Sequence, residues 1–303
     1  MSVITSGSFA KALLPGVKKW HGEAYNEKAK LWPMIFERDM STRAYEELVQ
    51  VSGFGLFAAK NEGDAITYDS RSQGFVTRLT HVTYASGFIV TEEAIEDDQY
   101  DVVARQRARA LGRSGRVTEE TIAGNVLNRA FNSSYTGADG KELLATDHPN
   151  YSGGTFSNEL ATAADLSEAS LEDLCIQIEQ ATDDRGLRIG LMPKSLIVAP
   201  ANRFEAMRIL KSVGQNDTAN NAINALKASG LFSSDPIINP YLTDDDAWFV
   251  KTDCPDGLIG LMRREMSFGV DNDFDTSNAK FKATFRASWG WADPKGVYGS
   301  PGA

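Results

Sequence analysis

The chain has 303 residues, of which 42% are hydrophobic and 24% are charged; this is typical of a globular protein with one large domain or two ordinary ones. Its net charge of -10 argues against nucleic-acid binding by the whole surface, because such binding needs a positive field, but it allows a local basic patch. No stretch approaches the roughly 20 apolar residues of a membrane span, and the N-terminal residues contain no signal-peptide apolar run.

Residues 1–50 have the pattern of an N-terminal arm with helical pieces. Phe9, Leu13 and Val17 recur at helical spacing, but Pro15 interrupts the pattern. The rest of the arm is rich in aromatic residues without a regular period. We therefore expect the arm to pack on another surface.

Residues 54–90 are predicted to form a long β-hairpin around the polar turn DSRSQG at 69–74. The second strand is rich in β-branched and aromatic residues. At about 3.3 Å per residue, an arm of about 15 residues reaches roughly 50 Å, which exceeds the diameter of a small domain. The tip should project from its own core, and so little of it is apolar that it needs another surface to lie on.

A long helix, or two collinear pieces, is predicted over residues 91–131, with Thr91 as the N-cap. Gly112 and Gly115 weaken the pattern within it. Residues 132–166 are rich in loop-forming residues.

Residues 167–262 are predicted to form a compact α/β or α+β unit. Its first helix carries an apolar face, and Ser170 with Asp173 resembles a capping box at its start. Three closely spaced strands follow, PIINPYL, AWFVKT and LIGLMR. Further on, residues 280–291 alternate between apolar and polar side chains, which predicts a long strand with one buried face.

Catalytic motifs are weak in this sequence. Asp147 and His148 could serve as an orienting acid and a general base for a distant serine, but adjacent side chains seldom point at one another. The sequence has neither a phosphate-binding glycine loop nor enough spaced ligands for a metal. We expect no cofactor, and two reduced thiols at Cys175 and Cys254, because nothing indicates secretion.

Five arginines of the predicted long helix have no acid among them. They are Arg105, Arg107, Arg109, Arg113 and Arg116. They would be spread around the helix axis. Two interpretations stay open: a solvated helix surface that pairs with acidic groups of another subunit, or contact with nucleic-acid phosphates.

The order of these elements resembles that of the major capsid protein of tailed bacteriophages, and within it the Mu-like major head subunit group. The segments that carry the resemblance are KNEGDAITYDSRSQGFVTRLTH, GFIVTEEAIEDDQYD, LLATDHPNYSGGTFSN, LIVAPANRFEAMRIL and FRASWGWADPKGVYG. They span nearly the whole chain. The resemblance implies an α+β fold whose extended loop lies on a neighbouring subunit, so that its missing core is supplied by another copy.

The resemblance also implies a division of the chain into five parts. These are an N-terminal arm (1–50), an extended loop (51–90), a peripheral domain with a spine helix (91–166), an axial domain (167–265), and a return to the peripheral domain with the C-terminus (266–303). The implied intersubunit contacts of the extended loop are Lys60, Tyr68, Arg71, Phe75, Arg78 and His81. The five arginines would form a basic patch on the inner face of the shell.

The implied function is structural and not enzymatic. Copies of the chain would form the hexamers and pentamers of an icosahedral shell around double-stranded DNA, assembled in the host cytoplasm without a cofactor or a membrane. The hairpin begins near residue 54 and leaves no room for a long leading scaffold segment. This implies either a separate scaffold protein or a processed chain that has been renumbered, and the other expected partners are a portal and loosely held DNA. The alternatives are an encapsulin-type nanocompartment, another virion part such as a tail or connector component, and a cytosolic hydrolase built on Asp147 and His148.

Overall fold

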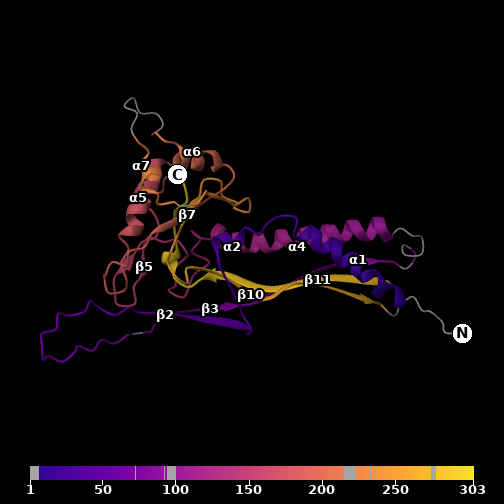
Figure 1. Cartoon of the computed structure of the whole chain (residues 1–303), viewed down its shortest axis with the longest axis horizontal. Helices are drawn as coiled ribbons and strands as arrows, with labels where there is room; N and C mark the ends of the chain where they lie inside the picture. Colours follow the sequence, from indigo (N-terminus) through magenta and orange to yellow (C-terminus); the bar gives the residue numbers. More distant parts are fainter. Residues whose placement is uncertain are drawn as a thin grey trace.

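The computed structural model describes residues 7–71, 73–91, 93, 100–214, 223–232, 234–273 and 278–303. The molecule has the shape of an L with a projecting loop (Figure 1). A long sheet lies along one limb with two helices on it, a second unit rises at one end, and residues 52–71 extend outward below that unit. Helices and sheets are both present, so the predicted α+β class is confirmed.

The long sheet has the strand order β1-β10-β11-β4. β10 (Leu258–Asn272) and β11 (Ala279–Trp291) are antiparallel, and β11 is also antiparallel to β4 (Val82–Val90). The short β1 (Glu37–Met40) runs parallel to β10 at the other edge. Residues far apart in the sequence therefore share one sheet.

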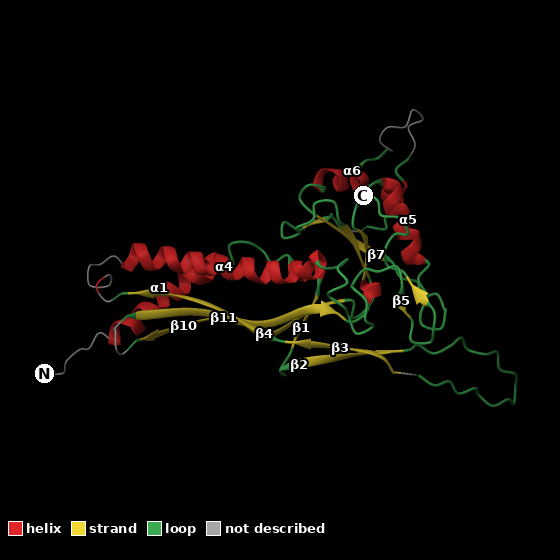
Figure 2. Cartoon of the chain, turned by 180° about the vertical axis from the view of Figure 1, so that it is seen from behind, coloured by secondary structure: helices red, strands yellow, loops and turns green. Residues whose placement is uncertain are grey.

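One face of the long sheet is covered by helices. α4 (Tyr100–Asn128) lies along the sheet and α1 (Gly7–Tyr25) crosses beside it (Figure 2). Phe281, Ala283 and Phe285 of β11 are buried on this side, as the alternating sequence predicted. Of the predicted helix 91–131, residues 92 and 94–99 lie outside the described residues, and the helix ends at Asn128.

The second unit is built on a sheet with the strand order β12-β9-β7-β8. Its strands are β7 (Pro193–Val198), β8 (Ile237–Ile238), β9 (Trp248–Thr252) and β12 (Val297–Ser300). Its helices are α5 (Glu168–Glu179), α6 (Arg203–Lys211) and α7 (Ala225–Ser229). Leu171, Leu174 and Trp248 are among the fully buried side chains between them. Smaller elements are α2 (Trp32–Ile35), β5 (His148–Pro149), β6 (Thr155–Phe156) and the 3-10 helix η1 (Pro294–Gly296).

Three local predictions for this part of the chain are wrong. The strand LIGLMR is the start of β10 and belongs to the long sheet, because β11 and β1 supply its hydrogen-bonding partners. The C-terminal residues were expected to stay with the long strand 280–291, but they form β12, which pairs with β9 in the second sheet. The capping box at α5 is formed by Ser167 and Ser170, whose hydroxyls accept each other's backbone N–H, so Ser170 is the third residue of the helix and not its cap.

The predicted hairpin over 54–90 is also wrong in its pairing. β3 (Gln73–Thr80) pairs with β2 (Tyr45–Val51), and the chain then passes into β4, which pairs with β11. Residues 52–71 are all described and contain no strand. The switch at His81 occurs because β4 buries Val90 and stacks Phe88 on Phe281 only by pairing with β11.

Gly112 and Gly115 have a packing role that their low helix propensity hides. A Cβ on Gly112 would lie 2.5 Å from the backbone oxygen of His21 and 3.1 Å from the nitrogen of Tyr25, so this glycine sets how closely α1 approaches α4. A Cβ on Gly115 would lie 2.6 Å from Cε of Met266, the end of a flexible side chain. The two positions therefore differ in how readily they accept a methyl group.

We predict that Gly112→Ala lowers the free energy of unfolding by about 1–3 kcal/mol, because overpacking against a backbone outweighs a helix-propensity gain of about 1 kcal/mol. Gly115→Ala is the matched control and should be neutral or stabilising by up to about 1 kcal/mol. Urea denaturation followed by circular dichroism measures both. Equal effects at the two positions would show that α1 is not held by close backbone contact.

Candidate assembly surfaces

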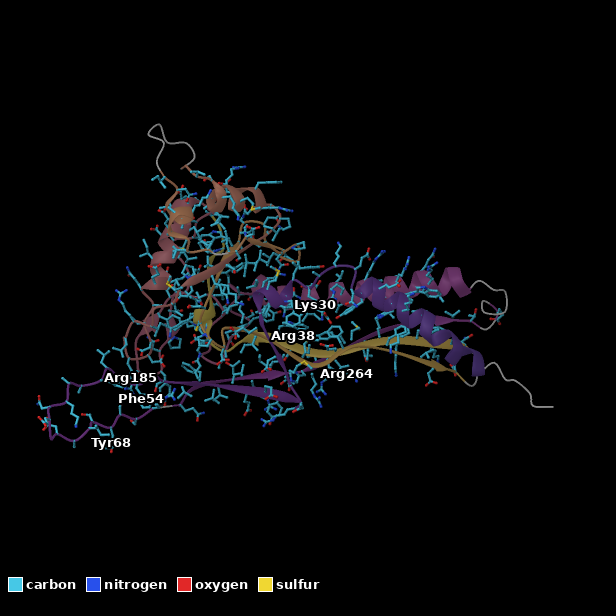
Figure 3. All side chains as sticks on the ribbon, viewed as in Figure 1. Lys30, Arg38, Phe54, Tyr68, Arg185 and Arg264 are labelled. Atoms are coloured by element: carbon cyan, nitrogen blue, oxygen red, sulfur yellow. The ribbon has the colours of Figure 1, made fainter. Side chains whose placement is uncertain are left out.

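The extended segment, residues 52–71, exposes large apolar side chains without a core of its own. These are Phe54, Leu56, Phe57, Ile66 and Tyr68, whose exposed fractions are 52%, 83%, 97%, 59% and 87%. Figure 3 labels Tyr68 on the projecting part of this segment and Phe54 nearer to the body of the molecule. An apolar group concentrated on a projecting segment marks an interaction surface.

The base of the extended segment is held by polar contacts. The Asp69 carboxylate accepts the Gly55 N–H at 2.8 Å, which joins the two sides of the segment, and the Arg185 guanidinium lies 2.5 Å from the same carboxylate. Arg71 donates to the backbone oxygen of Ser52 at 3.1 Å. These bonds hold the pKa of the Asp69 carboxyl below its usual value, first through Gly55 and then through Arg185.

Five of the six predicted contact residues lie on or beside this segment. Lys60 and Tyr68 are exposed on it, and Arg71 stands at its base. Phe75 and Arg78 lie in β3, where Phe75 packs edge-on to a tyrosine of the body and Arg78 covers the ring of Tyr45 at 3.6 Å. These five residues remain predicted intersubunit contacts. Phe75 is already partly buried in its own subunit.

The sixth, His81, is not available for an intersubunit contact. It is 4% exposed, and its Nδ1 lies 3.0 Å from the hydroxyl of Ser288 on β11. Burial lowers the pKa of His81, and the nearby Arg286 adds to the effect. His81 therefore fixes the point where the chain leaves the hairpin and enters the long sheet.

The predicted basic patch on α4 is largely paired within the chain. Arg109 lies 3.9 Å from Glu23 and Arg113 lies 2.8 Å from Glu27, in and just after α1. Arg107 donates to the backbone oxygen of Ile89, and Arg105 lies over the ring of Trp20. Sequence reasoning did not find the acidic partners of Arg109 and Arg113 because these lie 86 residues earlier in the chain.

Arg116 does not belong to such a patch, because it is buried. Its Nη1 lies 3.1 Å from the Glu119 carboxylate, and its Nε donates to the backbone oxygen of Tyr25 at 3.0 Å. The Tyr25 hydroxyl donates to Glu119 at 2.5 Å, and burial with this bond raises its pKa. The neighbouring Glu120 accepts the N–H groups of Leu31 and Trp32. Sequence reasoning missed this cluster, which joins the N-terminal residues to α4.

The hydrolase hypothesis fails on geometry. His148 is fully buried, with Nδ1 2.6 Å from Asp139 and Nε2 3.1 Å from the side-chain oxygen of Asn158. Asp147 turns away and pairs with Lys141 on the surface. A general base has to reach solvent or substrate, and this imidazole reaches neither.

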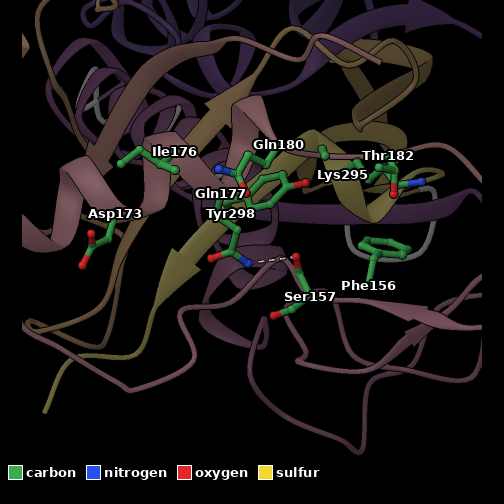
Figure 4. Close-up of a pocket in the computed structure, with 10 residues that line it drawn as sticks. Phe156, Ser157, Asp173, Ile176, Gln177, Gln180, Thr182, Lys295 and Tyr298 are labelled. Carbon is green, nitrogen blue, oxygen red and sulfur yellow. Dashed lines mark hydrogen bonds between the residues drawn. The ribbon is translucent and has the colours of Figure 1, made fainter. Parts of the chain in front are cut away.

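A pocket of about 350 Å³ lies beside α5, and its serine and lysine do not form a catalytic pair (Figure 4). Its Ser157 hydroxyl donates to the backbone oxygen of Glu159 at 2.8 Å, and Gln177 donates to the Ser157 backbone oxygen. Lys295 lies 4.4 Å from the centroid of Phe156, over the ring and not beside the serine. In the described part of the chain, no three acidic, histidine or cysteine side chains are placed to hold a metal ion, and no helix is long and apolar enough to cross a membrane.

The family model described as "Phage capsid protein" matches residues 75–300. The chain belongs to the phage capsid protein family. It is a structural protein of the phage capsid, located in the virion, and not an enzyme. The Asp147/His148 hydrolase is therefore excluded by the family as well as by the burial of His148.

Solved shell structures share this fold at low sequence identity. The procapsid of bacteriophage JBD30 is 15% identical with a TM-score of 0.54, over 97% of this chain and 75% of that one. The Mycobacterium phage Patience structure is 12% identical with a TM-score of 0.53, over 97% of this chain and 87% of that one. A virus-like particle from Pyrococcus furiosus is 10% identical with a TM-score of 0.53, over 94% of this chain and 97% of that one. No curated protein matches the sequence.

We predict that His148→Ala lowers the free energy of unfolding by about 2–4 kcal/mol, because it removes the buried hydrogen bonds of the imidazole to Asp139 and Asn158 and leaves a cavity in its place. The matched control is Asp147→Asn, which breaks only the exposed pair with Lys141 and should cost less than about 1 kcal/mol. Urea denaturation of both variants measures the difference. A His148→Ala protein as stable as the wild type would contradict the structural role.

Proposed function

We propose that the chain forms the hexamers and pentamers of an icosahedral head around double-stranded DNA, and that each extended segment packs on a neighbouring copy. The observation that supports this is the group of exposed apolar side chains on residues 52–71, which have no core in their own subunit. Fully burying one such side chain contributes about 1.5–3 kcal/mol. The segment therefore gains its burial only through association.

The same proposal divides the chain by its two sheets. The peripheral domain is the long sheet with α4, and the axial domain is the unit on the second sheet. The predicted boundaries of 91–166, 167–265 and 266–303 change in two places, because β10 begins at residue 258 and β12 belongs to the second sheet. Residues 1–50 remain the arm and 51–90 the extended loop, with β4 shared with the peripheral domain.

The Mu-like assignment and the partners rest on the resemblance of the sequence. We infer assembly in the host cytoplasm with a separate scaffold protein and a portal. Contact with packaged DNA is weak and non-specific in this proposal, since Arg109 and Arg113 are already paired with acids of the same chain. The exposed Arg105 and Arg107 are the remaining members of the proposed inner basic surface.

The encapsulin-type nanocompartment would use the same fold, which the virus-like particle from Pyrococcus furiosus shares, but the match to the phage capsid family favours the phage head. The two functions predict different contents. A phage head assembled with its DNA-packaging proteins would contain DNA. A nanocompartment shell would contain a protein cargo.

We predict that the double variant Leu56→Ser and Phe57→Ser folds normally and forms shells at a rate at least about tenfold lower than wild type, because it removes about 3 kcal/mol or more of burial between subunits. Light scattering and negative-stain electron microscopy measure shell formation, and circular dichroism checks the fold.

Glu62→Gln is the matched control in the same segment, since it changes a polar side chain and leaves the apolar group intact. Normal shells from the double variant would contradict the packing of the extended segment on a neighbour. Rings or tubes from the wild type would instead indicate another virion part, and a small oligomer alone would indicate that a scaffold is needed.

A further inference from the structure

The extended segment leaves the body of the subunit where the hairpin β2–β3 meets the long sheet, with Phe75 of β3 edge-on to Tyr151. The hairpin β2–β3 is attached by a small apolar cluster in which Leu48 and Leu79 contact Ile259, Leu261 and Ala292. Gln50 adds one hydrogen bond to the backbone oxygen of Ala292 at 2.7 Å. Beyond this cluster lies a cavity of about 590 Å³ between the hairpin and the second unit.

The far side of that cavity carries a preformed turn, residues 181–189, between α5 and β7. The Asp183 carboxylate accepts the N–H groups of Arg185 and Leu187, both at 2.8 Å, and the backbones of Asp183 and Leu187 are bonded across the turn. Gly186 has φ 78°, the left-handed conformation that a glycine permits without strain. The turn is thus rigid before anything binds to it, and it presents Arg185 outward.

Arg185 makes two bonds with the base of the extended segment. One Nη atom lies 2.5 Å from Asp69, and the other donates to the backbone oxygen of Ser70 at 2.6 Å. Because Asp69 also accepts the N–H of Gly55, the same guanidinium holds both sides of the segment. Figure 3 labels Arg185 and Phe54 at the end of the molecule from which the extended segment projects. A planar fork that engages two acceptors fixes a direction as well as a distance.

We propose that Arg185 is a positioning residue, a latch that sets the direction of the extended segment in the free subunit before a neighbouring copy receives it. The apolar cluster serves as the pivot and the cavity gives the hairpin room to tilt when the latch is open. This inference rests on the proposed function for its role in assembly. The latch itself is a property of the single subunit.

The first test is hydrogen–deuterium exchange of the full-length subunit, kept below the concentration at which it assembles. Arg185→Gln should speed exchange in peptides that contain Gly55 by about two- to fivefold, as expected for a partly exposed charged contact. Exchange in β11 should stay unchanged. Arg188→Gln is the matched control, because Arg188 is exposed in the same turn and its side chain makes no bond to the described residues. Asp69→Asn combined with Arg185→Gln should add little to either single change.

The second test is the rate of shell formation by light scattering. Arg185→Gln should slow it by at least the factor seen in exchange, since only subunits with the segment in the binding orientation are competent, while Arg188→Gln should not. Unchanged exchange at Gly55 in Arg185→Gln would overturn the latch. Faster exchange with a wild-type assembly rate would overturn its role in positioning and leave the proposed function intact. If the wild type forms no shells with or without a scaffold, the proposed function and the assembly role fail together, and exchange alone then decides the latch.

Discussion

The double pairing of β11 is the constraint on which the rest of the subunit depends. β11 bonds to β10 on one side and to β4 on the other, and its apolar face lies under α4 and α1. A strand with two partners and one covered face has a single workable register, because a slip by one residue would expose Phe281 and Phe285 and bury lysine and arginine. This register joins three segments that lie far apart in the sequence.

The same pairing explains why the extended segment has no core. Once β4 is paired with β11, only β3 remains to pair with β2, and residues 52–71 between them have no sheet to join. Their apolar side chains stay in solvent, which is unfavourable in an isolated subunit, and they are available to pack against another copy in an assembly. The subunit is therefore stable along its long sheet and incomplete at its extended segment.

Charge in this subunit acts mainly within the chain. Two arginines of α4, Arg109 and Arg113, meet glutamates in and just after α1, and the buried Arg116 and Glu119 join the Tyr25 hydroxyl. A buried pair of this kind adds little stability over an apolar pair, but removing one partner is costly, so it selects one arrangement of the arm on the helix. At the extended segment, the partly exposed pair of Arg185 and Asp69 contributes direction through the two acceptors of the guanidinium.

The sequence by itself determined the α+β class, the one-sided burial of β11, the long helix and, through the order of its elements, the family. Each of these follows from local periodicity or from the order of segments along the chain. The tertiary structure decided which strands pair, since β4 and β10 are apolar enough to fit either sheet and only the partners at hand select one. It also decided that His81 and Arg116 are buried and that Arg185 meets Asp69 across 116 residues. Contacts between distant residues depend on how the helices and strands pack in space. The type of each side chain alone does not predict that packing.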